Sequence, residues 1–166
     1  LEESIPAEED SVVLRPFPST RITEAFAASG NLISQSVKKK FTEDDIARYE
    51  SDIDTLLLEV NAFLGGPKIS NLEELEVRDL DQIIARARIF TGRIEDLLGR
   101  LSTVALDLEN ESELLYQNKE RWELTLGSQR ADATPASRTE RIQQTIQRLD
   151  SVRLLLQEDL ALIVEG

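Results

Sequence analysis

The sequence predicts an all-α protein, an elongated antiparallel helical bundle or coiled coil built on one very long central helix. Apolar residues recur in alternating steps of three and four and form one stripe, which no proline interrupts. Such a stripe stays on one side of a slightly underwound helix and presents one seam to partner helices. No segment shows the alternation typical of a strand. The stripe comprises Leu80, Ile83, Ala87, Phe90, Ile94, Leu97, Leu101, Val104, Leu108, Leu115, Trp122 and Leu126, with Ser112 and Lys119 as its only polar steps.

An irregular segment is expected over residues 1–18, where Pro16 and Pro18 bias the residues before them to extended geometry. A first helix is expected over about residues 20–39, capped by Ser19 or Thr20. Its apolar positions are Ile22, Phe26, Ile33 and Val37, with Ala25 and Ala28 alongside.

A second helix is expected over about residues 43–64. Thr42 places a capping hydroxyl three residues before the carboxylate of Asp45, and three acids occupy the first turn. The helix should stop at the Gly-Gly-Pro sequence that begins at Gly65. Its apolar face consists of Ile46, Tyr49, Ile53, Leu56, Leu57, Val60, Phe63 and Leu64.

The long helix is expected over about residues 71–127. Ser70 or Asn71 can cap it, and two glutamates follow in its first turn, at positions 73 and 74. Gly92 and Gly99 each weaken a helix by about 1 kcal/mol relative to alanine. Alternatively, both let a neighbouring helix approach closely.

A last helix is expected over about residues 135–165, because Pro135 suits the first position of a helix. Any kink in the long helix is expected at residues 109–113. The second helix should line the first half of the long helix and the last helix its second half, both antiparallel, with the first helix packed at one end. Residues 19–166 are therefore expected to form one elongated helical domain, an extended rod. The last helix buries Ile142, Ile146, Leu149, Val152, Leu156, Leu160 and Ile163 in this arrangement.

The charge of the chain argues against two classes of partner. It carries 19 basic and 32 acidic residues, for a formal net charge of −13. Such a chain repels nucleic-acid phosphates and anionic membrane surfaces, so neither is expected to bind. The only basic cluster, Lys38-Lys39-Lys40, lies where the first helix should end, and cations there suit the helix dipole. A nucleic-acid or lipid contact is the alternative interpretation of this cluster.

No catalytic, cofactor-binding or metal site is expected, and the chain is not predicted to be an enzyme. It has no cysteine and no histidine, which excludes thiolate and histidine-dependent nucleophile systems. No glycine-rich phosphate loop occurs. Carboxylates two residues apart on a helix diverge in direction and lack the glycine turn of a calcium loop. A solvated face is therefore the prediction for the acidic pairs, Asp52 with Asp54, Asp79 with Asp81 and Asp107 with Glu109.

Trp122, the single tryptophan, falls in step with the apolar stripe. We expect it to be a buried anchor against the last helix, with Arg121 or Lys119 stacked on its ring or lining its rim. A ligand-binding tryptophan is the alternative. Surface ion pairs are expected for the arginines of the long helix, Arg86, Arg88, Arg93 and Arg100.

Three motifs follow one another along the chain. After a helix pair and a glycine–proline break, the sequence Asn-Leu-Glu-Glu-Leu from Asn71 opens the long leucine-rich helix. That helix ends in Lys-Glu-Arg-Trp-Glu-Leu-Thr from Lys119, and Arg141-Ile142 opens the last helix. This layout resembles the N-terminal extracytoplasmic region of large bacterial channels related to the small-conductance mechanosensitive channel. The resemblance covers roughly residues 20–166.

The resemblance implies a non-enzymatic periplasmic domain that modulates channel gating or assembly. Its implied partner is the rest of its own membrane protein, and self-association along the helical seam is compatible with the pattern. The chain has no methionine, even at position 1, and no segment apolar enough to span a bilayer, so we expect it to be a piece of a larger protein. The alternative function is a cytoplasmic coiled-coil adaptor or scaffold that binds partner helices.

Overall fold

The computed structural model describes residues 13–66, 69, 76–128 and 135–165. All regular structure in these ranges is helical, which confirms the all-α prediction. Helix α4 is 52 residues long and is the long helix that the apolar stripe predicts. The elements in chain order are the 3-10 helix η1 (Ser19–Arg21) and the α-helices α1 (Ile22–Lys38), α2 (Glu43–Leu64), α4 (Val77–Ser128) and α5 (Ala136–Glu165).

The first helix begins with a 3-10 turn rather than with the expected hydroxyl cap of Ser19 or Thr20. η1 follows Pro18 with no side-chain hydrogen bond at its N-terminus. The Arg21 N–H instead donates to the Pro18 carbonyl at 2.9 Å. A backbone bond of this kind satisfies one of the donors that a helix start leaves open, so no capping side chain is needed for it. α1 ends at Lys38, which places the basic cluster at the helix end as predicted.

Helix α2 has the predicted bounds and the predicted cap. The Asp45 N–H donates to the Thr42 hydroxyl oxygen at 3.2 Å, and the Thr42 hydroxyl and N–H donate to the Asp45 carboxylate. These bonds, the hydroxyl bond foremost, lower the pKa of Asp45. At the other end, the Gly65 N–H donates to the Asn61 carbonyl at 2.9 Å. Pro67 lies outside the described residues.

Helix α4 begins later than the sequence predicts, at Val77 rather than near residue 71. Its first hydrogen bonds run from the N–H groups of Asp79 and Leu80 to the Glu76 carbonyl, and Glu76 itself is not helical. The expected caps and first-turn acids fall within residues 70–75, which lie outside the described part of the chain.

The remaining helix boundaries lie within one residue of their expected positions. α4 continues as one helix through residues 109–113, the expected place for a kink, and ends at Ser128. α5 begins at Ala136, so Pro135 precedes the helix instead of occupying its first position. The Pro135 carbonyl accepts the Arg138 N–H at 2.9 Å.

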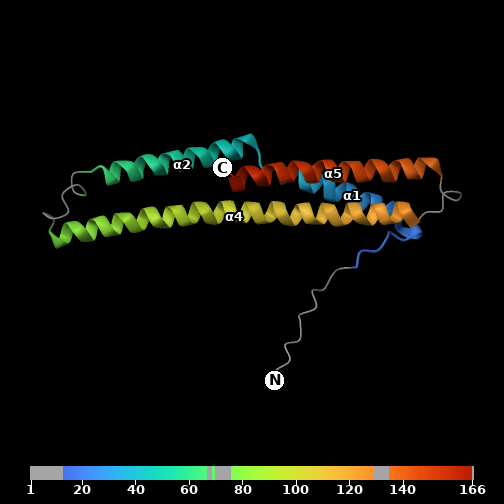
Figure 1. Cartoon of the computed structure of the whole chain (residues 1–166), viewed down its shortest axis with the longest axis horizontal. Coiled ribbons are helices and arrows are strands. Elements are labelled where there is room, and N and C mark those ends of the chain that lie inside the picture. The colour runs from blue at the N-terminus through green and yellow to red at the C-terminus, as the bar shows by residue number, and fades with distance from the viewer. Residues whose placement is uncertain (1–12, 67–68, 70–75, 129–134, 166) are drawn as a thin grey trace, which may run out of the picture. The chain divides into compact units, whose positions relative to one another are not determined.

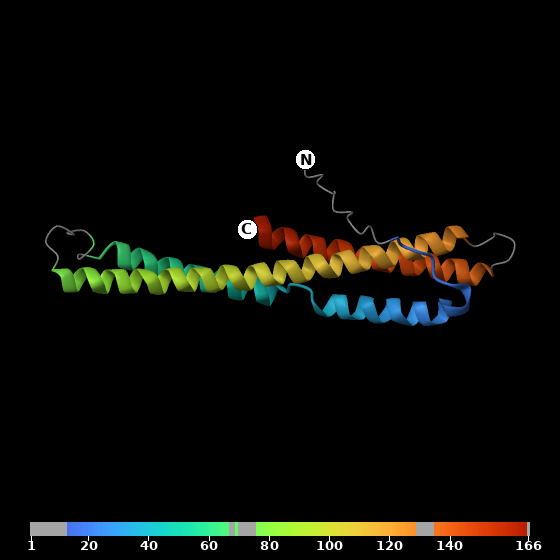
Figure 2. The ribbon, with the colours of Figure 1, turned by 90° about the horizontal axis from the view of Figure 1, so that it is seen from below.

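The helices form two compact units that share α4 and α5. Unit 1 consists of the residues up to Lys38 together with Glu111–Leu155, and unit 2 consists of Lys39–Asn110 together with Leu156–Gly166. In unit 1, α1 and the first part of α5 lie along the C-terminal part of α4 (Figures 1 and 2). In unit 2, α2 lies along the N-terminal part of α4. These are the pairings expected from the sequence.

Side-chain contacts fix the direction of each helix in unit 1. Moving forward along α1 from Ser29 to Ser36, the partners on α4 move backward from Asn118 to Glu111, so the two helices are antiparallel. α5 is likewise antiparallel to α4, since Lys119 contacts Asp150 and the earlier residue Tyr116 lies under the later residue Arg153.

The same relation holds in unit 2. Arg93 pairs with Glu59 and Arg100 with Asp52, so α2 runs antiparallel to α4. The end of α5 is joined to the start of α2 by a buried hydrogen bond from the Phe41 N–H to the Asp159 carboxylate, at 3.0 Å.

Burial of the apolar stripe differs between the units. Leu115 and Trp122 in unit 1 are fully buried, whereas Leu80 and Ile94 in unit 2 are 38% and 41% exposed. The stripe is therefore closed off in unit 1, where three helices meet, and partly open where α2 and α4 pair. Gly92 and Gly99 do not serve a close approach, because no heavy atom lies within 4 Å of the Cβ that either would carry.

Replacing Gly99 by alanine should therefore stabilise the protein. Gly99→Ala is expected to raise the free energy of unfolding by about 0.5–1 kcal/mol, because alanine restricts the unfolded backbone and meets no neighbour. Urea unfolding followed by circular dichroism measures the change. Gly66→Ala is the control, since its Cβ would lie 3.2 Å from the Phe63 carbonyl oxygen and should bring no gain. A destabilised Gly99→Ala protein would contradict the open environment of Gly99.

Candidate functional site

The acidic pairs singled out in the sequence do not converge on a site. Asp52 accepts a hydrogen bond from Arg100 of the neighbouring helix at 3.3 Å, while Asp54 on the same helix is exposed. Within the ranges that the structure describes, no group of three carboxylates is close enough to hold a metal ion.

Trp122 is fully buried, as predicted, but the groups that hold it differ from those expected. Its ring contacts the rings of Phe17 and Phe26, with centroids 4.7 Å and 4.5 Å away, and its Nε1–H donates to the Ser29 hydroxyl at 2.8 Å. These partners belong to α1 and the segment before it, not to the last helix. Arg121 stacks on Phe17 rather than on the indole, with 4.0 Å between the guanidinium carbon and the ring centroid. Trp122 thus joins the N-terminal part of the chain to α4.

A polar seam, which the sequence analysis missed, lies between α1 and α4. It consists of Ser29 and Ser36 on α1 and of Asn118 and Glu111 on α4. The Ser29 hydroxyl donates to Asn118 Oδ1 and the Ser36 hydroxyl to Glu111 Oε1, each at 2.7 Å. Both serines are fully buried, and Glu111 is 3% exposed. The sequence signal for this seam is a spacing of seven residues within each helix, between Ser29 and Ser36 on α1 and between Glu111 and Asn118 on α4. Seven residues is the repeat of packed helices.

Lys119, a polar step in the stripe, pairs with the last helix. Its Nζ lies 2.9 Å from the Asp150 carboxylate, and Arg153 lies 3.3 Å from the same carboxylate. The hydrogen bond from Lys119, with a smaller contribution from Arg153, lowers the pKa of Asp150. The apolar stripe therefore tolerates a lysine here because α5 supplies its partner.

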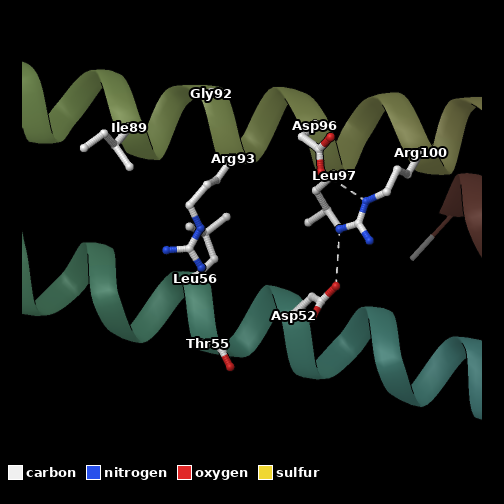
Figure 3. A pocket seen from close by; sticks show the side chains of 9 residues that line it. All are labelled: Asp52, Thr55, Leu56, Ile89, Gly92, Arg93, Asp96, Leu97 and Arg100. Carbon is white, nitrogen blue, oxygen red and sulfur yellow. Dashed lines mark hydrogen bonds and ion pairs between the residues drawn. The ribbon is translucent and has the colours of Figure 1, made fainter.

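One flank of the α2–α4 pair in unit 2 is charged. This charged face consists of Asp52 and Glu59 on α2 and Arg93 and Arg100 on α4. Figure 3 shows Asp52, Arg93 and Arg100 from close by. Arg100 also contacts Asp96 at 3.2 Å. These ion pairs confirm the expectation for Arg93 and Arg100. Because the side chains are almost half exposed, each pair contributes about 0–1 kcal/mol and serves mainly to set the register of the helices.

The opposite flank of α2 is apolar. Tyr49 is buried, and Asp52 lies three residues later, on the charged face. Ile53 lies four residues after Tyr49 and therefore points to the other side, since each residue turns a helix by about 100°. Leu57 and Leu64 extend this side of α2.

Helix α4 shows the same division. Phe90 is buried, Arg93 lies on the charged face, and Ile94 falls on the other side. Because the ion pairs join the two charged flanks, the two apolar flanks come together on the opposite side of the pair. We call the resulting surface the apolar face, which consists of Ile53, Leu57 and Leu64 of α2 and Leu80, Ile84, Ile94 and Leu98 of α4.

No protein-family model matches the sequence, and neither does any curated protein or solved structure. The resemblance to mechanosensitive channels therefore stays a prediction. Among the residues with described positions, no helix is long and apolar enough to cross a membrane. The apolar face is the feature of this chain that most resembles a binding surface, because large apolar patches mark interaction sites.

The polar seam should contribute measurably to stability. Ser36→Ala is expected to lower the free energy of unfolding by about 1–3 kcal/mol, because the buried Glu111 carboxylate loses a donor. Chemical denaturation measures the loss. Ser34→Ala, two residues away at an exposed position of the same helix, is the matched control and should change stability by less than about 0.5 kcal/mol. Equal effects of the two substitutions would show that the seam is not a stabilising contact.

The Lys119–Asp150 pair should make the free energy of unfolding depend on pH in the acidic range. Because the pKa of Asp150 is lower in the folded protein, its contribution is complete above the pKa of the unfolded chain and is lost as pH falls through the folded value. Asp150→Asn should therefore flatten the acid side of the stability–pH profile. Asp54→Asn, at an exposed carboxylate, is the control and should leave the slope unchanged. Identical profiles for wild type and Asp150→Asn would contradict the pairing.

Proposed function

We propose that this chain is a non-enzymatic helical domain that works by binding other helices. The observation that carries the proposal is the apolar face, whose seven aliphatic side chains are each 37–58% exposed. Monomeric soluble proteins rarely leave a contiguous apolar patch larger than a few hundred Å² uncovered. An amphipathic helix laid along such a face is a common mode of recognition.

We further propose that the domain belongs to the periplasmic side of a mechanosensitive channel, where it modulates gating or assembly. The support is the motif that begins at Lys119. In unit 1 this motif has a definite structural task, because Trp122 contacts Phe17 and the Thr125 hydroxyl accepts the Phe17 N–H at 2.8 Å. The partner on this proposal is the rest of the same membrane protein.

A cytoplasmic adaptor or scaffold is the second candidate, because the apolar face suits it equally well. The gene sequence around the region that encodes this chain distinguishes the two. A signal sequence upstream and membrane-spanning segments with a pore downstream support the channel domain. A gene that encodes neither contradicts it and favours the adaptor.

Patch-clamp recording tests the channel proposal directly. The tension needed to open the natural channel is compared with and without residues 1–166, and subunit assembly is measured alongside. We expect the deletion to change the opening tension or the assembled fraction, and Leu98→Glu on the apolar face to act in the same direction. Ile89→Glu is the control, because Ile89 is 61% exposed and lies among the residues of the charged flank. Unchanged tension and assembly after deletion would contradict the proposal.

A further inference from the structure

We infer that the apolar face binds a single amphipathic α-helix from outside residues 1–166, and that the apolar stripe of this helix is flanked by lysines or arginines. The inference rests on the proposed function and specifies the chemistry of its partner. Three observations carry it: the heptad positions of α4, the size of the open face, and the charges around it.

The first observation concerns rows of residues spaced by seven along α4. In unit 1 two neighbouring rows are each covered by a helix, whereas around Leu97 and Leu98 of unit 2 one row is covered and the other is open. In unit 1, Asn118 contacts α1 and Lys119 contacts α5. Leu97 lies three heptads before Asn118, is 8% exposed and lies at the contact with α2. Leu98 lies three heptads before Lys119 and is 58% exposed. Helix α2 therefore takes the position that α1 has in unit 1, and the position of α5 is open along the apolar face.

A third row of α4 residues, which lies between the rows of Leu97 and Leu98, also differs in exposure along the helix. Its members recur every seven residues, and Leu115 and Trp122 of unit 1 are fully buried. In unit 2, which also contains the end of α5, Leu108 is 1% exposed, but Leu80 and Ile94 remain 38% and 41% exposed. A third helix along α2 and α4 in unit 2 would bury these side chains as α1 and α5 together do in unit 1. The row consists of Leu80, Ala87, Ile94, Leu101, Leu108, Leu115 and Trp122.

The second observation is the size of the face. From Leu80 to Leu98 the face extends for about 27 Å at 1.5 Å per residue. A partner helix of about three heptads covers that length. One helix suffices, because the charged face occupies the other flank of the pair and only this flank is apolar.

The third observation is the charge around the face. The exposed side chains that border it are mostly acidic: Glu50 and Asp54 on α2, and Asp81 and Glu95 beside the single basic residue Arg88 on α4. A second copy of this chain, with a net charge of −13, would set acids against acids. The third helix of unit 1 offers a precedent, because residues 136–155 of α5 contain four arginines and only two acids. Charge complementarity thus favours a partner helix with basic flanks.

Two synthetic helical peptides test the inference on the full 166-residue chain. Both carry the same leucine and isoleucine stripe over about three heptads, one with lysine flanks and one with glutamate flanks. We expect the lysine-flanked peptide to bind at least about tenfold more tightly by isothermal titration calorimetry, and expect this advantage to shrink in high salt. Equal affinity of the two peptides would overturn the charge assignment, and binding of neither would overturn the inference.

Substitutions locate the binding surface. Leu98→Glu and Leu57→Glu should each weaken binding of the lysine-flanked peptide by about tenfold or more. Ile89→Glu and Leu58→Glu are the matched controls, since both side chains are exposed, at 61% and 71%, and lie off the apolar face. Equal losses at the face and at the control positions would contradict the assignment.

A fluorescence experiment locates the binding surface without the glutamate variants, and so does not depend on how well they fold. The chain has no cysteine, so Leu98→Cys and Ile89→Cys each allow one environment-sensitive fluorophore to be attached. Adding the lysine-flanked peptide should shift the emission only at position 98. Sedimentation without peptide measures self-association of the chain. If the chain self-associates as its concentration rises and the fluorophore at position 98 shifts with it, a second copy is the occupant and the inference is wrong. The proposed function is judged separately by the opening tension of the channel.

Discussion

Burial of one long apolar stripe is the constraint on which the rest of this structure depends. Helix α4 carries the stripe over many turns, and an amphipathic helix of this length gains its stability from the helices that cover it. In unit 1, α1 and α5 cover it from both sides, so Leu115 and Trp122 are fully buried. In unit 2, which also contains the end of α5, α2 covers one side of α4 and leaves Leu80, Ile94 and Leu98 exposed. The apolar face consists of exposed residues of the stripe, Leu80 and Ile94, and of exposed apolar residues beside it on α4 and on α2.

The two units fix the register of their helices with different interactions. Unit 1 places serines at heptad positions of α1, and their hydroxyls bond Asn118 and the buried Glu111 of α4. Small side chains let helices approach, and a fully paired polar contact fixes their register. Unit 2 fixes its register with exposed ion pairs between arginines and carboxylates. Exposed pairs contribute little energy, so the pairing of α2 with α4 depends on a narrow line of buried residues, Tyr49, Leu56, Phe90 and Leu97.

Much of this fold follows from local sequence signals. Helix α2 begins after the capping box at Thr42 and ends before Gly65, as both signals predict, because they act through the backbone of adjacent residues. The period of the stripe predicts that α4 is continuous. The start of α4 and the start of α1 were predicted less well, since several residues near each could cap a helix and only the tertiary fold selects the one that begins it.

The candidate surface was predictable only in part. The sequence shows that Leu57, Leu64, Ile84 and Leu98 are apolar at helical spacing, but it does not show which of them stay exposed. That depends on where α5 runs, which is a long-range property. The contacts of Trp122 with Phe17, Phe26 and Ser29 were not predicted, for the same reason. The polar seam was not predicted, because serine, asparagine and glutamate are usually surface residues. Their burial follows only from the helix that packs against them.

Amide hydrogen exchange in the natural, complete protein is the most direct measurement of the central claim. It compares the amides of α2 and of residues 77–101 in that protein with the same amides in the isolated 166-residue chain. The account predicts markedly slower exchange in the complete protein, because a partner helix covers the apolar face there. Equal exchange rates in the two samples would show that the face stays bare, and would contradict its role as a helix-binding surface.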